Sequence, residues 1–180
     1  MRKPLLALTV ATAAVVALAS PAAAAPTDET VVTFTVGAAN LDITAPPAVN
    51  LGATFADGVI EGNIGPVQVV DQRAALTATW VATVTTTAFT TGAGAPEETI
   101  VPSLVEYWSG PATATTGTGT FVPGQLTAAE RVTLNLPRTA FSKTSGSGNN
   151  SATWSPTLRV NVPATAVTGT YTATVTHSVA

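Results

Sequence analysis

Residues 152–162 decide the fold, and they read Ala-Thr-Trp-Ser-Pro-Thr-Leu-Arg-Val-Asn-Val. Apolar residues and a proline occupy the even positions, among them Trp154 and Leu158, while polar residues such as Arg159 occupy the odd positions. Successive side chains of a β-strand point to opposite faces, so a period of two indicates a strand with one buried and one wet face. The stretch therefore predicts an antiparallel strand at the surface of a core.

The same alternation recurs along the chain, separated by turn signals rich in Gly, Pro, Asn and Asp. Threonine dominates the polar faces, where its branched stem packs on the pleat and its hydroxyl meets water. About eight strands are predicted, at 31–36, 40–44, 66–71, 79–89, 98–108, 130–136, 152–162 and 169–179. A short helical turn is predicted at 127–130, which has capping-box spacing. This pattern predicts an all-β fold, an immunoglobulin-like antiparallel β-sandwich, with residues 25–180 as a single domain.

Residues 1–24 have the features of a secretory signal peptide. Arg2 and Lys3 precede an apolar run over 5–19, and the small residues 22–24 provide an A-x-A cleavage site. The run is shorter than the ~20 residues that a membrane-spanning helix needs. We expect cleavage after Ala24, no membrane span afterwards, and a secreted protein that is extracellular or associated with the cell wall.

Composition excludes several functions. The leader takes two of the seven basic residues with it, so the mature chain has five basic and ten acidic residues and a formal charge of −5. A nucleic-acid partner is not expected, because binding it needs a basic surface. The chain has no cysteine and one histidine, which excludes disulfides, thiol catalysis and the usual zinc sites. We expect no metal and no cofactor.

The only catalytic suggestion is the dipeptide His177-Ser178, with Asp71 or Glu130 as an orienting acid. Neighbouring residues on a strand point to opposite faces, so His177 cannot easily serve Ser178 as a base. No G-x-S-x-G nucleophile elbow is present. The protein is therefore expected not to be an enzyme, and His177 is expected to be a neutral histidine with one ring nitrogen hydrogen-bonded.

Six residues are assigned roles from their positions. Asp71 and Arg73 lie two apart on one strand face and are expected to pair or to brace the following turn. Trp154, like Trp80, is in register with apolar residues and is expected in the core. Trp108 shares a face with a glutamate and is expected to be exposed, as an independent candidate for stacking on a sugar ring. Tyr171 fits either the corner tyrosine of immunoglobulin-like sandwiches or a plain core tyrosine.

Three segments together resemble the WxL-domain surface proteins of Gram-positive bacteria. They are residues 65–73 (Gly-Pro-Val-Gln-Val-Val-Asp-Gln-Arg), the triplet 80–82 (Trp-Val-Ala), and the final segment 171–179. The family has a G-x-V-x-V-x-D-x-R segment, a first W-x-L motif, and a second motif of the form Y-x-x-x-[LIV]-T-W-x-L. Both triplets are degenerate here, because Ala82 replaces a leucine and His-Ser-Val replaces the second W-x-L. The Ala-, Thr-, Gly- and Pro-rich composition is itself typical of actinobacteria.

The resemblance implies an exported protein that attaches non-covalently to peptidoglycan. The positions that match the family motifs are Trp80, His177 and Val179, which are thereby binding candidates beside Trp108. The first hypothesis is thus association with cell-wall glycan. The alternative is a structural or adhesive subunit that assembles with other surface proteins through a sheet edge, for which the final strand is the candidate.

Overall fold

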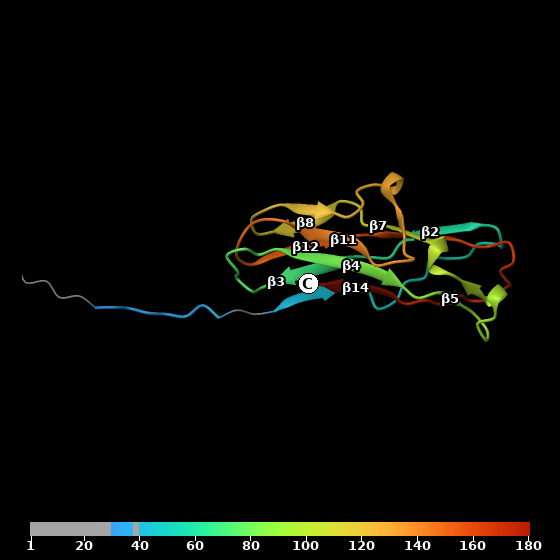
Figure 1. The fold of residues 1–180 in the computed structure, drawn as a ribbon, viewed down its shortest axis with the longest axis horizontal. Helices are drawn as coiled ribbons and strands as arrows, with labels where there is room; N and C mark the ends of the chain where they lie inside the picture. Colours follow the sequence, from blue (N-terminus) through green and yellow to red (C-terminus); the bar gives the residue numbers. More distant parts are fainter. Residues whose placement is uncertain (1–29, 38–39) are drawn as a thin grey trace, which may run out of the picture. The chain divides into compact units, whose positions relative to one another are not determined.

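The computed structural model describes residues 30–37 and 40–180, and the predicted signal peptide lies outside these residues. Residues 36–180 form one compact unit whose regular secondary structure is antiparallel β-strands and three short 3-10 turns (Figure 1), which confirms the predicted all-β class. Three four-stranded sheets and one two-stranded sheet are present in the described part of the chain.

The strands are named here by sheet, in the order of their pairing. The first sheet is β1 (Leu41–Thr44), β3 (Val67–Asp71), β12 (Asn150–Trp154) and β8 (Ala112–Thr116). The second is β10 (Val132–Thr133), β7 (Val105–Trp108), β13 (Thr157–Asn161) and β2 (Val59–Asn63). The third is β14 (Val175–Val179), β4 (Trp80–Thr86), β11 (Arg138–Lys143) and β9 (Phe121–Pro123), and β5 (Phe89–Thr90) pairs with β6 (Thr99–Ile100). Single 3-10 turns are η1 (Pro96–Glu98), η2 (Pro102–Leu104) and η3 (Ala128–Glu130).

The first two sheets are two halves of one layer, separated by a line of prolines that we call the proline crease. Along the chain, β3 follows β2, β8 follows β7 and β13 follows β12, with a break at Pro66, Pro111 and Pro156 respectively. Strand β12 pairs with β3 and β8, and β13 pairs with β2 and β7, so the two sheets have the same strand order. Proline has no N–H to give to a ladder, so three neighbouring strands break at the same level.

The second layer is the β14–β4–β11–β9 sheet, and the core lies between the layers. Alternate residues of β3, β4, β7, β12 and β13 are buried, as the period-two pattern predicted. The indole of Trp154 and the ring of Phe141 stack across the core with centroids 4.9 Å apart and an interplanar angle of 22°. This aromatic contact joins β12 of the first layer to β11 of the second.

The strand predicted for 31–36 is not formed. Residues 30–37 have no regular secondary structure, and the apolar side chains of Val32, Phe34 and Val36 are 81, 87 and 72% exposed. Alternation along one segment does not by itself supply the partner strand that a β-ladder needs.

Several other predicted boundaries were also wrong. Residues 152–162 form two strands because of Pro156; 98–108 contains β6, η2 and β7; 130–136 forms only β10; and 169–179 forms only β14. Strands β2, β8, β9 and β11 were not predicted. The turn predicted at 127–130 is present as η3, where Glu130 Oε2 accepts the N–H groups of Leu126 and Thr127.

Tyr171 has the geometry of a corner tyrosine. Its hydroxyl lies 3.0 Å from both the carbonyl oxygen of Val167, four residues upstream, and that of Glu97. The half-buried ring thus fixes the loop that leads into β14.

Candidate functional site

The residues that the sequence singled out for binding lie in two different environments. Trp80 is 2% exposed and its side chain belongs to the core. His177 and Val179 are half-buried on the inward face of β14, opposite Val84 and Ala82 of β4. Trp108 alone points outward, because its neighbour Tyr107 is the residue of β7 that faces the core.

The Trp80 side chain anchors a buried polar cluster rather than a ligand. Its Nε1 donates to Asn150 Oδ1 at 2.9 Å, and Asn150 Nδ2 donates to Asp71 Oδ2 at 3.2 Å. Asp71 is fully buried and accepts three hydrogen bonds from Arg73, two from the guanidinium and one from the backbone N–H. The Arg73 Nη2 also donates to Thr79 O at 2.9 Å. The expected Asp71–Arg73 pair is therefore present, and it ties β3, β12 and the start of β4 together.

The hydrogen bonds between Asp71 and Arg73 favour the charged form of both side chains. The side-chain hydrogen bonds from Arg73 hold the pKa of Asp71 below its usual value, although burial acts in the opposite direction. Nearby, Lys143 is also buried, and its Nζ donates to the carbonyl oxygens of Ala78 and Ser145 at 2.7 Å each. Burial lowers the pKa of Lys143, while the charge of Asp71 partly offsets this. Because each ionised group has its own partners, the cluster serves as a structural brace.

His177 completes a second internal network. Trp154 Nε1 donates to the hydroxyl oxygen of Tyr107 at 3.2 Å, and that oxygen lies 3.2 Å from His177 Nε2. The other ring nitrogen, Nδ1, is buried and has no hydrogen-bond partner among the described residues. Burial lowers the pKa of His177 to about 4, so the imidazole is neutral at pH 7, as expected. Its ring contacts the rings of Tyr107 and Trp154, with centroids 5.8 and 6.4 Å away, on the inward face of β14.

The outward-facing site surrounds Trp108 on the β10–β7–β13–β2 sheet. Trp108 lies opposite Thr157, and two residues earlier Glu106 lies opposite Arg159. Each oxygen of the Glu106 carboxylate forms an ion pair, one with Arg131 Nε at 3.1 Å and the other with Arg159 Nε at 3.5 Å, the second without a hydrogen bond from Nε. The Trp108 indole is half-buried.

This arrangement, which we call the Trp108 face, combines an aromatic ring with a fixed carboxylate and two guanidinium groups. The sequence analysis noted Glu106 beside Trp108 but missed Arg131 and Arg159. Arg159 sits on the polar side of the alternating stretch 152–162, yet its cross-strand partner depends on pairing that alternation does not specify. Arg131 comes from the turn after η3, which no periodicity connects to β7.

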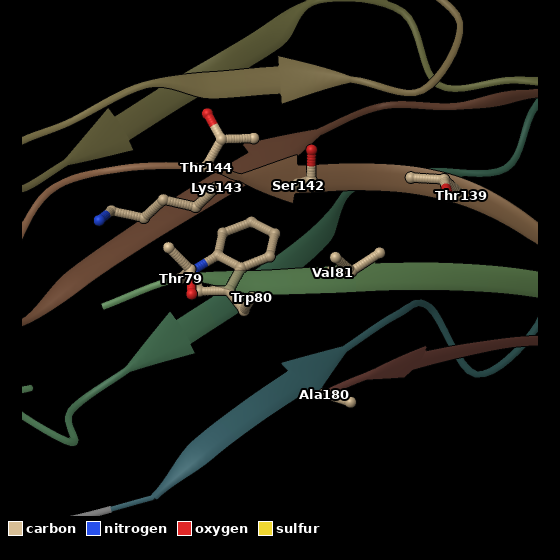
Figure 2. Close-up of a pocket in the computed structure, with 8 residues that line it drawn as sticks. All are labelled: Thr79, Trp80, Val81, Thr139, Ser142, Lys143, Thr144 and Ala180. Atoms are coloured by element: carbon tan, nitrogen blue, oxygen red, sulfur yellow. The ribbon is translucent and has the colours of Figure 1, made fainter. Parts of the chain in front are cut away.

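A shallow depression of about 660 Å³ lies on the outer face of the other layer (Figure 2). Its rim comes from β4 and β11 and the chain end, and Figure 2 shows the lining residues Thr79, Trp80, Val81, Thr139, Ser142, Lys143, Thr144 and Ala180. Trp80 and Lys143 are buried beneath this surface, so its exposed part offers hydroxyl groups and one valine. It has no accessible aromatic ring or charge to select a ligand.

Other features limit the chemistry further. Within the described residues, no group of three or more His, Asp or Glu side chains is placed to hold a metal ion. No helix of that part is long and apolar enough to cross a membrane. Comparisons of the chain with family models, curated proteins and solved structures found no match.

Proposed function

We propose that the chain is an exported, non-enzymatic surface protein that associates non-covalently with cell-wall glycan through the Trp108 face. The observation that carries the proposal is the outward position of Trp108 beside the carboxylate of Glu106, which two arginines hold in place. Aromatic rings pack on the apolar faces of sugar rings. Carboxylate and guanidinium groups supply the acceptors and donors that sugar hydroxyls need.

The burial of the family-motif positions changes the mode of binding that the resemblance implied. Trp80 and His177 are occupied in the Asp71 cluster and the Tyr107 network, so their expected contribution is to stability. The proposal therefore assigns affinity to Trp108 and places Trp80, His177 and Val179 among the groups that hold the sandwich together.

The test is co-sedimentation of the expected mature form, residues 25–180, with insoluble peptidoglycan at moderate salt. The Trp108→Ala variant should lose most of the pelleted fraction while it stays folded, as shown by a cooperative thermal transition. The control is Leu76→Ala, which removes a different apolar side chain that is 90% exposed. His177→Ala should lower the melting temperature and leave binding intact in the folded fraction. Failure of the unaltered protein to pellet, or normal pelleting of Trp108→Ala, would overturn the proposal.

A further inference from the structure

The outward side chains of the Trp108 face form two rows that cross the strands, and the first row carries no charge. The register places Thr157 of β13 opposite Trp108 of β7 on one side and opposite Asn63 of β2 on the other. Residues that lie opposite each other in an antiparallel pair have their Cβ atoms about 4.5–5.5 Å apart on the same face. Trp108 and Thr157 are half-buried and Asn63 is exposed. We call these three residues the uncharged row.

The second row lies two residues further along each strand, and its charges alternate in sign. Arg159 is opposite Glu106 on β7 and opposite the exposed Glu61 on β2. Arg131, which pairs with the other oxygen of Glu106, immediately precedes β10, the neighbour of β7 on the side away from β13. The order across the sheet is therefore Arg131, Glu106, Arg159 and Glu61, which we call the charged row. Its two positive and two negative formal charges sum to zero.

The charges of this row already have partners within the protein. Besides its two arginines, Glu106 accepts a hydrogen bond from Asn161 Nδ2 at 3.4 Å on Oε2. A ligand with a carboxylate or a phosphate would compete with Glu106 for the guanidinium groups, and a cationic ligand would compete with Arg159. The expected mature chain also carries a formal charge of −5, which repels an anionic polymer as it approaches. The electrostatics of the face therefore favour a ligand without a charge.

The uncharged row supplies the groups that such a ligand needs. The indole of Trp108 packs on an apolar sugar face, and the Thr157 hydroxyl both donates and accepts hydrogen bonds. The Asn63 amide is held in a fixed orientation, because its Nδ2 donates to Ser155 O at 2.9 Å and its Oδ1 accepts the N–H of Gly65 at 2.8 Å. Each of these two atoms retains one more N–H or lone pair for a ligand. The row covers two strand spacings, about 10 Å, which is longer than one sugar ring.

We infer that the Trp108 face selects an uncharged segment of glycan, with hydroxyl and acetamido groups but no carboxylate or phosphate, that lies across the strands along the uncharged row. Trp108 packs on one sugar ring, and Thr157 and Asn63 hydrogen-bond to the next unit. The charged row lies alongside and offers its remaining donors and acceptors to sugar hydroxyls without a net charge. Because the site is the one proposed above for glycan binding, the inference rests on that function and adds the class of sugar.

The first test is co-sedimentation of the mature form with three insoluble polymers. They are peptidoglycan, chitin, which is an uncharged polymer of N-acetylglucosamine, and phosphocellulose, which is an anionic glycan. We expect the protein to pellet with peptidoglycan and chitin and to stay in solution with phosphocellulose. The affinity for chitin should change by less than about twofold between 0.1 M and 1 M salt, although the screening length falls from about 10 Å to about 3 Å.

The second test changes the charge of the face and the hydroxyl of the uncharged row separately. Glu61→Gln raises the sum of the charged row from zero to +1 and should leave the affinity for chitin within about twofold, whereas an anionic ligand would bind more tightly. Thr157→Val removes a hydroxyl and keeps the side-chain shape, so it should weaken chitin binding about fivefold, as for one hydrogen bond. The matched control is Thr83→Val, a half-buried outward threonine of β4 on the other layer, which should bind normally.

The outcomes separate this inference from the function on which it rests. Pelleting with peptidoglycan but not with chitin, a large loss of binding at 1 M salt, or tighter binding by Glu61→Gln overturns the inference and leaves glycan association standing, because the ligand is then a charged component. Normal chitin binding by Thr157→Val overturns the placement along the uncharged row. No pelleting with either peptidoglycan or chitin overturns both the inference and the proposed function.

Discussion

The Asp71 cluster and the Trp108 face each contain an ion pair between an arginine and a carboxylate, with the carboxylate buried in the first and at the surface in the second. Arg73 Nε lies 2.9 Å from Asp71 Oδ1, and Arg131 Nε lies 3.1 Å from Glu106 Oε1. The Asp71 side chain is fully buried, however, while that of Glu106 is 20% exposed and its arginine partners more so. Water can replace a lost partner at the surface but cannot replace one in the interior. The two ion pairs should therefore differ in their contribution to stability, not in their geometry.

The largest expected effect is that of Asp71→Ala. Removing the carboxylate leaves the backbone N–H and the Nε of Arg73 without their acceptor, while Arg73 Nη2 keeps Thr79 O and Asn150 Nδ2 keeps Gly148 O. We expect the free energy of unfolding to fall by about 3 kcal/mol, as for a broken buried ion pair. Urea denaturation measures this, with Glu106→Ala as the matched control, for which less than about 1 kcal/mol is expected. Equal losses in the two variants would contradict the comparison.

An intermediate effect is expected from pH, through His177. The folded protein binds a proton on this ring only near pH 4, whereas the unfolded chain binds it near 6.5. Between these values the unfolded state holds more protons, so stability decreases as pH falls, with a slope of at most about 1.4 kcal/mol per pH unit. Above pH 6.5 this group contributes no slope.

The measurement is urea denaturation at several pH values between 7 and 4. His177→Gln should remove most of the slope in that window, and Arg131→Ala should retain it. Asp71 affects stability at lower pH than His177. Its pKa is lowered in the folded protein, so it stabilises the fold above the ordinary pKa of a carboxyl group, and this contribution is lost as pH falls through the folded pKa. A slope that persists unchanged in His177→Gln would show that other groups carry it.

The smallest effect is expected for Arg131→Ala. Its guanidinium is 37% exposed and pairs with a carboxylate that keeps Arg159 as a second partner. A change of about 0.5 kcal/mol or less in the free energy of unfolding is expected, vanishing at 1 M salt, where charges are screened within about 3 Å. Thermal unfolding at low and high salt checks this, and a large, salt-independent loss would place Arg131 with the buried groups.

The fold class could be predicted because β3, β4, β7, β12 and β13 follow strict alternation. Strand β11 was not predicted, and the reason is physical. A bulge between Thr139 and Phe141 turns two successive residues, Ala140 and Phe141, into the core. Lys143 also points inward, where a sequence pattern expects an apolar residue. The strand predicted at 31–36 failed in the opposite way, since the alternating pattern is present but residues 30–37 form no regular secondary structure.

The candidate site was predictable only in part. The outward position of Trp108 follows from its place beside Tyr107 on a strand, and the Asp71–Arg73 pair follows from their spacing. The burial of His177 against Tyr107 and Trp154 depends on which strands meet across the core. The Glu106 ion pairs depend on register between β7 and β13. Neither is encoded in the spacing of residues along one segment.

The proline crease has a consequence for the chain before the sandwich has closed. Without Pro66, Pro111 and Pro156, three neighbouring stretches would each form one long, β-prone ribbon. Runs of that kind without proline and with little charge are those that stack into fibrils. By interrupting all three at one level, the prolines keep each uninterrupted run to about five residues, so the threonine-rich chain can remain unassembled until its own layers have met.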